Sequence, residues 1–314
     1  LINDVNVNII IISTPNHTHY EILNKCIESE KSILVEKPLC CNIEECKKIY
    51  NLVSNNSSYN FKNIFWIGME YRYKKPIELI LDLVNKREIG DLKIFSIKEH
   101  RYPFLKKVNH WNITKKNTGG TFVEKCCYFF HLMMLLVKSK PVSIYASGGL
   151  DVNHLNPTYD NYKTELYDNG FVILNFENGV RGCLELCMFA ECSENQEEFS
   201  IVGNEGSIKV CYPSNEIVIS KRIENGKFEI EDIPPSRDEI KTVKFKIPIE
   251  DKFKDLGYHE GINKFYLILH NYQKNGDSDF GSIDLPGLKR IIKYNLTNIH
   301  GKENIVKLEF NNFI

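Results

Sequence analysis

The chain has 314 residues, of which 42% are hydrophobic and 26% charged, and its formal net charge is -1. This near-neutral balance argues against nucleic acid or an anionic membrane as the main partner, and no apolar run approaches the roughly 20 residues of a membrane-spanning helix. The ten cysteines include the adjacent pairs Cys40-Cys41 and Cys126-Cys127 but no C-x-x-C motif, so we expect reduced thiols in a cytoplasmic protein and no metal site.

The first 72 residues alternate short apolar strands with amphipathic helices. The strands are apolar on both faces, which is typical of a parallel sheet buried between layers of helices. We therefore predict half of a doubly wound parallel sheet. Its strands are predicted over Val5–Ser13, Ser32–Glu36 and Ile64–Glu70, and its helices over Tyr20–Ser29 and Ile43–Val53, the second capped by Asn42.

No G-x-G-x-x-G phosphate turn precedes these strands, although a complete dinucleotide-binding sheet carries one. The chain also begins at Leu1, without Met, and enters a strand almost at once. We therefore expect a fragment of a longer protein, with a partial NAD(P)-binding Rossmann domain over residues 1–72.

Beyond residue 72 the pattern changes to a second α/β domain, predicted over residues 73–314, with a large mostly antiparallel sheet. Turn-forming residues at 177–179 and 203–206 separate several strands, as in antiparallel hairpins. Residues 224–246 are polar and predicted to be irregular. The predicted helices are Pro76–Lys86, one from Gly119-Gly120 to about Lys138, Tyr258–Gln273 and Pro286–His300. The predicted strands are Leu92–Glu99, Val142–Gly148, Gly170–Phe176, Val180–Met188, Glu198–Val202, Ser207–Tyr212, Glu216–Lys221 and Asn304–Phe310.

The segment Ile33–Leu39 ends an apolar strand abruptly in Glu36-Lys37-Pro38. Proline cannot donate to a strand ladder, so the strand stops there, at the sheet edge where ligands bind in open α/β folds. A partly desolvated lysine at that edge can donate to a substrate oxygen and take part in proton transfer. The alternative is a surface ion pair in a strand-to-helix turn.

Three polar residues recur on the otherwise apolar helix that follows Gly120. Glu124, Tyr128 and His131 stand at i, i+4 and i+7 and therefore face one way. Together with Lys37 they can form a proton relay, in which the positive charge of the lysine is expected to lower the pKa of the phenol. The alternative is a set of internal hydrogen bonds that satisfies buried polar groups.

An ordered set of short motifs resembles the glucose–fructose oxidoreductase/inositol dehydrogenase (Gfo/Idh/MocA) family. The set spans nearly the whole chain. Its members are Thr14-Pro15-Asn16-His17-Thr18-His19, Glu36-Lys37-Pro38, Gly68-Met69-Glu70-Tyr71-Arg72-Tyr73, Asn117-Thr118-Gly119-Gly120 with Glu124 and Tyr128, Glu177-Asn178-Gly179-Val180, and Tyr258-His259-Glu260-Gly261.

The resemblance implies a Rossmann domain followed by an α/β domain whose large sheet also makes homo-oligomer contacts. It implies NAD or NADP as cofactor, and a sugar, inositol or related polyol as the substrate whose hydroxyl or carbonyl carbon exchanges a hydride. The implied catalytic residues are Lys37, Tyr128, Glu124 and His131. The residues implied to bind the cofactor are Ser13, Thr14, Pro15, Asn16, Glu36, Lys37, Pro38 and Arg72.

The resemblance assigns His19 to capping the helix after the Thr-Pro-Asn turn. The aromatic and basic loop that contains Arg101, His110 and Trp111 is the expected wall for a polyhydroxylated substrate; the alternative is simple packing at a domain boundary. No nucleic acid or membrane partner is expected.

Two positions depart from the family pattern. Most members carry histidine at the place of Tyr128 and often aspartate at the place of His131. Tyrosine occurs at the base position in relatives that resemble glucose–fructose oxidoreductase and dihydrodiol dehydrogenase, so Tyr128 is a candidate base. The alternative is a catalytically inactive relative that serves as a binding or oligomerising scaffold.

Overall fold

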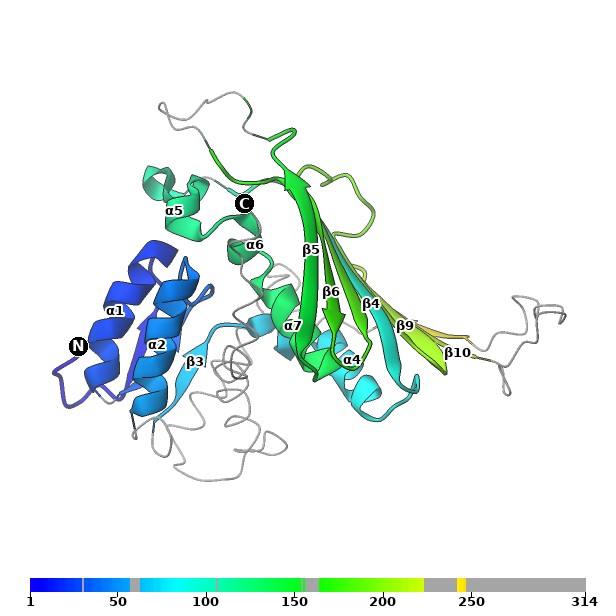
Figure 1. Cartoon of the computed structure of the whole chain (residues 1–314), viewed down its shortest axis with the longest axis horizontal. Coiled ribbons are helices and arrows are strands. Elements are labelled where there is room, and N and C mark those ends of the chain that lie inside the picture. The colour runs from blue at the N-terminus through cyan, green and yellow to red at the C-terminus, as the bar shows by residue number, and fades with distance from the viewer. Residues whose placement is uncertain are drawn as a thin grey trace, which may run out of the picture.

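Two β-sheets organise the part of the chain that the structure describes, and helices lie against one face of each (Figure 1). The structure is a computed structural model and describes residues 1–29, 31–56, 63–105, 107–153, 155, 164–222 and 242–246. The first sheet has three strands and the second has eight.

The first sheet is parallel and follows the chain order β1-β2-β3. Its strands are β1 (Ile9–Ile12), β2 (Ser32–Val35) and β3 (Phe65–Ile67), each shorter than predicted. Helices α1 (His19–Cys26) and α2 (Ile43–Asn55) connect them and lie over the same face (Figure 1). As predicted, Asn42 caps α2, because its side-chain oxygen accepts a hydrogen bond from the Glu45 N–H at 2.9 Å.

Short helical segments follow the strands of both sheets, and η3 and α4 connect the first sheet to the second. The 3-10 segments are η1 (Asn16–Thr18), η2 (Ile27–Ser29), η3 (Glu70–Tyr73) and η4 (Val108–Ile113), the last of which is kinked at Asn109 and His110. The α-helices are α4 (Lys75–Asn85), α5 (Lys115–Thr118), α6 (Thr121–Glu124) and α7 (Cys127–Val137).

The second sheet has the strand order β11-β10-β9-β8-β4-β7-β6-β5. All neighbouring strands are antiparallel except β4 and β7, which are parallel. One face carries α4 and α7, whose apolar residues form a single core with the strands. The strands are β4 (Leu92–His100), β5 (Pro141–Gly149), β6 (Asn169–Phe176), β7 (Arg181–Cys187), β8 (Glu197–Gly203), β9 (Gly206–Tyr212), β10 (Glu216–Lys221) and β11 (Thr242–Lys246).

The predicted fold class is confirmed: a Rossmann-like parallel sheet with helices is followed by a large, mostly antiparallel sheet. The prediction that residues 224–246 are irregular is wrong for Thr242–Lys246, which pairs with β10 as an edge strand. The predicted elements Tyr258–Gln273, Pro286–His300 and Asn304–Phe310, and the motif that begins at Tyr258, lie outside the described residues.

The single helix predicted from Gly120 to Lys138 is also wrong, because it is interrupted between α6 and α7. The segments on either side of the interruption are bent by 41° relative to each other. Two contacts lie at the bend. The Lys37 ammonium donates to the Glu124 backbone carbonyl at 2.7 Å, and the Lys125 side chain turns to an ion pair with buried Glu99 at 2.8 Å. Both contacts come from residues distant in the chain, so helix periodicity does not reveal them.

Within the described residues, no single helix is long and apolar enough to cross a membrane. Residues 115–124 and Cys127–Val137, which are bent relative to each other, are together long and apolar enough, but this judgement uses length and composition alone. The apolar side chains of α7 are buried in the core against the second sheet, which accounts for that composition.

Candidate active site

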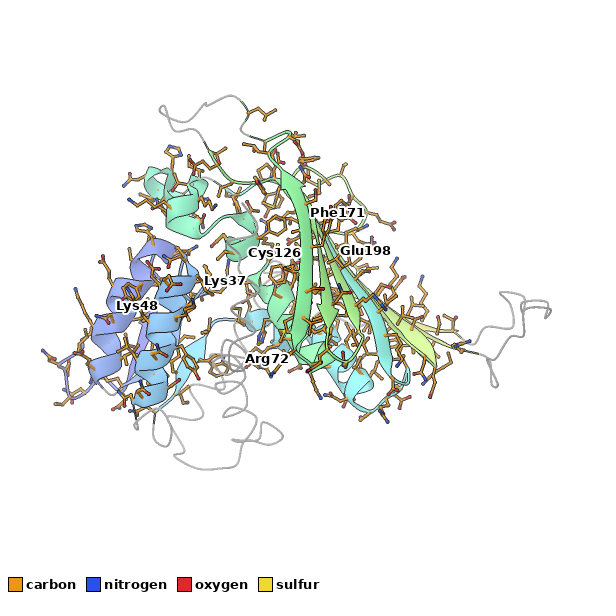
Figure 2. The ribbon with its side chains drawn as sticks, in the orientation of Figure 1. Lys37, Lys48, Arg72, Cys126, Phe171 and Glu198 are labelled. Atoms are coloured by element: carbon orange, nitrogen blue, oxygen red, sulfur yellow. The ribbon has the colours of Figure 1, made fainter. Side chains whose placement is uncertain are left out.

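The turns that follow β1 and β2 meet the end of α6, and Glu124 is their common contact. Lys37 Nζ lies 2.7 Å from the Glu124 backbone oxygen and 3.2 Å from its Oε1. The Asn16 side-chain amide donates to the other carboxylate oxygen, Oε2. Figure 2 shows Lys37 at the edge of the first sheet that faces the second sheet and its helices. One carboxylate therefore ties two turns of the Rossmann-like unit to the helix of the second unit.

Lys37 remains an ammonium in this setting. Burial works against its charge, but the negative charge of Glu124, with smaller effects of Cys127 and Glu70, outweighs burial and raises the pKa of the lysine. An ammonium has three N–H donors, and two of them are directed to Glu124. One donor is left for the oxygen of a ligand.

Tyr128 lies beside this lysine at the start of α7. Lys37 Nζ is 5.0 Å from the centroid of the phenol ring, and Tyr71 stacks on the ring with a centroid distance of 4.6 Å. The negative charge of Glu70 also acts on the phenol. Lys37, at the edge of the first sheet, and Tyr128, on a helix that packs against the second, are thus adjacent, and these are the two side chains predicted to cooperate.

The predicted lowering of the Tyr128 pKa is wrong in direction. Burial, and then the negative charge of Glu70, raise the pKa of the phenol well above its usual value, and the nearby ammonium does not reverse this. Tyr128 is therefore a protonated phenol at neutral pH. The carboxylate whose charge acts on this phenol was not assigned from the sequence.

Glu70 is that carboxylate. It begins η3, directly after β3, and is almost fully buried. Burial raises its pKa to about 7, although its own backbone N–H, the Tyr128 hydroxyl and Lys37 favour the charged form. The sequence held a signal for it, since a glutamate follows a buried strand at the same sheet edge as Lys37.

His131 faces a different neighbour from Tyr128. Burial, with the positive charge of Arg72, lowers the pKa of its imidazole to about 3, so the ring is neutral at physiological pH. Its Nε2 is buried and has no hydrogen-bond partner among the described residues. Arg72 lies over the ring of Tyr73, 5.3 Å from its centroid. Arg72 and His131 are thus coupled through charge, since the guanidinium disfavours a charged imidazole.

The remaining residues predicted to bind the cofactor form the two turns themselves. Ser13, Thr14 and Pro15 follow β1, and Glu36 and Pro38 follow β2. Burial raises the pKa of Glu36, whose carboxylate lies against Gly68: a Cβ on that glycine would be 3.1 Å from Glu36 Oε2. A side chain at position 68 would therefore press on the turn that presents Lys37.

His19 joins the same two turns instead of capping a helix as predicted. Its ring nitrogens lie 2.9 Å from the Pro38 carbonyl oxygen and 3.0 Å from the Thr14 carbonyl oxygen. The side chain is fully buried. The imidazole thereby fixes the spacing between the ends of β1 and β2.

We expect His19→Ala to lower the free energy of unfolding by about 1–3 kcal/mol, because it removes a fully buried imidazole and leaves the carbonyl group that accepts its N–H without a partner. Thermal or urea denaturation followed by circular dichroism measures the change. His17→Ala is the matched control, since His17 is exposed. An equal effect of the two substitutions would contradict the assigned role of His19.

The three predicted substrate-binding residues lie in two places. Arg101 follows β4; its guanidinium is 3.5 Å from the Glu99 carboxylate and lies over the rings of Tyr102 and Phe104. His110 and Trp111 belong to η4, where His110 is buried and Trp111 contacts the ring of His17 at a centroid distance of 6.2 Å. The η4 segment therefore touches the turn after β1.

A cluster of buried charges behind Tyr71, which we call the inner charge cluster, was not predicted. It consists of Glu99, Lys125, Arg101, Glu197 and Lys74. Lys125 pairs with Glu99 at 2.8 Å, and Lys74 pairs with Glu197 at 3.6 Å. Their positions in the sequence show no pattern, because the partners come from β4 and the residue after it, from β8, from the junction of η3 and α4, and from the α6–α7 bend.

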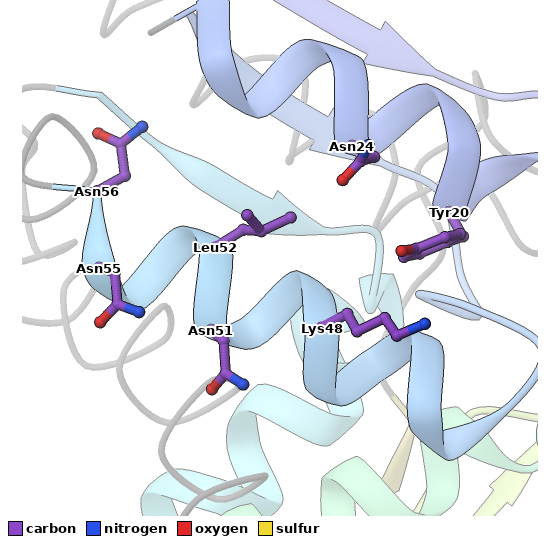
Figure 3. Close-up of a pocket in the computed structure, with 7 residues that line it drawn as sticks. All are labelled: Tyr20, Asn24, Lys48, Asn51, Leu52, Asn55 and Asn56. Atoms are coloured by element: carbon purple, nitrogen blue, oxygen red, sulfur yellow. The ribbon is translucent and has the colours of Figure 1, made fainter.

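A hollow of about 640 Å³ lies elsewhere, between α1 and α2 (Figure 3). It is shallow and lined by polar side chains, and it contains none of the predicted site residues. Its lining consists of Tyr20, Asn24, Lys48, Asn51, Leu52, Asn55 and Asn56.

Two family models match the chain. The model described as the oxidoreductase family, C-terminal alpha/beta domain, matches residues 82–278, and the model described as the oxidoreductase family, NAD-binding Rossmann fold, matches residues 1–61. Together they cover most of the chain in the order expected from the two sheets.

Individual relatives are similar at low identity. Levoglucosan dehydrogenase of Pseudarthrobacter phenanthrenivorans is 26% identical over 234 residues, which cover 68% of this chain and 57% of that enzyme. Myo-inositol 2-dehydrogenase of Thermotoga maritima is 21% identical over 208 residues, which cover 66% of this chain and 58% of that enzyme. A solved structure of levoglucosan dehydrogenase in complex with NADH and levoglucosan has a TM-score of 0.72 at 19% identity, and the match covers 99% of this chain and 80% of that one. The chain spans less than two thirds of the length of both curated relatives.

Proposed function

The chain belongs to the Gfo/Idh/MocA oxidoreductase family, and from this membership we propose that it transfers a hydride between NAD or NADP and a hydroxyl or carbonyl carbon of a sugar, an inositol or a related polyol. The observation that carries the proposal is the convergence of Lys37 and Tyr128, with the ammonium 5.0 Å from the ring centroid. A cationic donor and a phenol at one sheet edge suit proton transfer to and from a hydroxyl group.

The residues at this edge fit a nicotinamide cofactor. The carboxyl ends of parallel strands are where Rossmann sheets bind dinucleotides. The turns at residues 13–16 and 36–38 would hold the cofactor near its nicotinamide end, with Arg72 at the rim. The buried Nε2 of His131, which has no partner among the described residues, is a polar atom suited to a ligand. When bound, the cofactor supplies the hydride acceptor or donor.

We assign a separate task to each of the chain's own side chains. Lys37 donates its remaining N–H to the reacting oxygen, and Tyr128 exchanges a proton with that oxygen. Both oxygens of Glu124 are engaged, one by Lys37 and one by Asn16, so Glu124 holds the lysine in place. His131 stays neutral and borders the site. Arg101, His110 and Trp111 are proposed to line the substrate side of the site.

The test is a fluorescence titration of the full-length protein, including any segment that precedes Leu1, with NADH and with NADPH, followed by assays of NADH or NADPH formation. Levoglucosan and myo-inositol are the probes, because relatives that act on these compounds are similar to the chain. We expect saturable binding of one dinucleotide and slow oxidation of a cyclic polyol. If the full-length protein binds neither dinucleotide, the enzyme proposal is overturned and the scaffold alternative is favoured.

We propose that the second sheet pairs with a second copy of the chain. Its face opposite α4 and α7 carries Tyr145, Phe171 and Ile173, which are neighbours across β5 and β6 and are 67%, 52% and 39% exposed. Phe171 lies on this sheet in Figure 2. An exposed apolar patch of this kind is typical of an interface between proteins.

We expect Phe171→Lys to convert a dimer or larger oligomer to the monomer, because a lysine at the patch would be buried without a partner. Light scattering coupled to gel filtration measures the mass. Val5→Lys changes an equally apolar exposed residue away from this sheet and should leave the mass unchanged. A wild-type chain that is already monomeric at high concentration would contradict the proposal.

We further propose a boundary between the cofactor-binding part, residues 1–72, and the substrate and oligomerisation part, residues 73–314. The end of β3 at Ile67 and the start of α4 at Lys75 support it. We also propose a cytoplasmic location. All ten cysteines are unpaired thiols, which is the state that a reducing compartment maintains.

A further inference from the structure

The orientation of the Tyr128 ring decides where its hydroxyl points. The bond that joins a phenol ring to the rest of its side chain has a broad torsional preference, so packing against neighbours sets the plane of the ring. Tyr128 is almost fully buried, and Tyr71 stacks on it with 4.6 Å between the ring centroids and 27° between the ring planes. Stacked rings keep a preferred mutual geometry, so the Tyr71 ring restrains the tilt of the phenol.

Tyr71 is itself held at several points. Its side chain is buried, and its hydroxyl donates to the carboxylate of Glu197 at the start of β8. Lys74 Nζ lies 3.6 Å from the centroid of the Tyr71 ring and 3.6 Å from the second carboxylate oxygen of Glu197. The ring of Phe129 meets the Tyr71 ring edge-on, with a centroid distance of 5.5 Å and an angle of 84°. The hydroxyl, the face and the edge of the Tyr71 ring are therefore all restrained.

These contacts join the two units of the fold. Tyr71 belongs to η3, which follows β3 of the first sheet, whereas Tyr128 is on α7 and Glu197 is on β8 of the second sheet. The first sheet also presents Lys37, two residues after the end of β2. Tyr71 therefore ties the plane of the Tyr128 ring to the unit that carries the lysine.

Simple core packing is the alternative role for Tyr71. A leucine or a phenylalanine would also fill a buried site, and neither would need a partner for a hydroxyl group. The side chains of Lys74 and Glu197 are only 6% and 1% exposed, and burying two such charges is costly even when they form a pair. Core packing does not require this arrangement. It fixes the direction of the Tyr71 hydroxyl, which a hydrocarbon side chain cannot do.

We propose that Tyr71 is a positioning residue for Tyr128: its ring, anchored by Glu197 and Lys74, fixes the plane of the phenol so that the phenolic oxygen faces the reacting oxygen. The proposal rests on the proposed function. Proton exchange between the two oxygens requires a distance of about 2.6–3.2 Å. The phenolic oxygen is at the end of the ring farthest from the backbone, so a small tilt of the ring carries it out of that range. A misplacement of about 1 Å can lower a rate about 100-fold.

The first test needs neither substrate nor cofactor. In the full-length protein labelled with 13C in its tyrosine rings, the NMR resonances of Tyr128 are assigned by their loss in Tyr128→Phe. We expect the stacked ring of Tyr71 to shift these resonances upfield and to slow the flipping of the Tyr128 ring. Tyr71→Leu should remove the shift and speed the flips. Tyr71→Phe, which keeps the ring but loses the hydrogen bond to Glu197, should have an intermediate effect.

Tyr20→Leu is the matched control for the NMR test. Tyr20 lies on α1 at the hollow between α1 and α2, so its replacement should leave the Tyr128 resonances unchanged. Identical Tyr128 resonances in wild type and Tyr71→Leu would overturn the proposal. If Tyr71→Leu does not fold, an unchanged flip rate of the Tyr128 ring in Tyr71→Phe overturns it.

The second test measures kcat for the probe that the wild type turns over, per dinucleotide-binding site, with the sites counted by fluorescence titration. We expect kcat to fall about 100-fold in Tyr71→Leu and less in Tyr71→Phe, with KM and dinucleotide affinity unchanged. The solvent deuterium isotope effect on kcat should rise in both variants, because proton transfer then limits the rate.

Two outcomes of the kinetic test separate the proposals. A merely structural role of Tyr71 would reduce the number of dinucleotide-binding sites and leave kcat per site unchanged, and that result would overturn the positioning role. A wild-type protein that binds no dinucleotide refutes the proposed function, whereas the NMR test still decides whether Tyr71 fixes the ring of Tyr128.

Discussion

Replacing Lys37 with methionine is expected to lower kcat by about 10²–10⁴-fold, because it removes the cationic donor next to Tyr128 and keeps most of the aliphatic stem. The substitution deletes the ammonium contacts with Glu124 but leaves the hydrogen bond from Asn16 to the other oxygen of Glu124. The fold should therefore survive. Steady-state oxidation of the probe polyol, together with the circular dichroism spectrum, measures both effects.

Lys48→Met is the control for this experiment. Lys48 lies on α2 over the ring of Tyr20, at the hollow between α1 and α2 and away from Glu124 (Figure 3). We expect it to leave kcat unchanged. Wild-type activity in Lys37→Met would show that the ammonium takes no part in the reaction.

Truncation of Glu99 to alanine is expected to lower the free energy of unfolding by about 3–5 kcal/mol, since it leaves buried cations of the inner charge cluster without their main partner. Glu99 is completely buried, 2.8 Å from Lys125 and 3.5 Å from Arg101. Lys125 and Arg101 are themselves almost buried, so water cannot replace the carboxylate. Urea denaturation followed by tryptophan fluorescence measures the loss.

Asp82→Ala is the matched control for Glu99→Ala. Asp82 forms an ion pair of similar length with Lys86, but both side chains are at least half exposed. Exposed pairs contribute little, so the control should change stability far less. Equal losses of unfolding free energy in the two variants would mean that burial does not increase the contribution of the inner charge cluster to stability.

The fold could be predicted from the sequence because its signals are local. Strands such as Ser32–Val35 are continuous apolar runs, and Asn42 marks the start of α2 by a side-chain bond within one turn. Such patterns depend on neighbours along the chain. The interruption after Glu124 does not, since Lys37 and Glu99 reach it from other elements, and the prediction of one continuous helix failed there.

The candidate site was predicted only in part, for the same reason. The convergence of Lys37 with Tyr128 followed from placing one at a sheet edge and the other on a helix, with the help of a family resemblance. The direction of the Tyr128 pKa was wrong because Glu70 and burial act on it through space. The catalytic, cofactor-binding and substrate-binding roles of the named residues stay predictions until the variants are measured.

The engagement of Glu124 by both Asn16 and Lys37 has a consequence for motion between the two units. Domains joined by small interfaces usually rotate relative to each other. Here such a rotation would have to break the charge-assisted hydrogen bonds of both Asn16 and Lys37 with Glu124. Because both bonds end on the same carboxylate, they would have to break together. The geometry therefore favours two units that keep one orientation for as long as these hydrogen bonds hold.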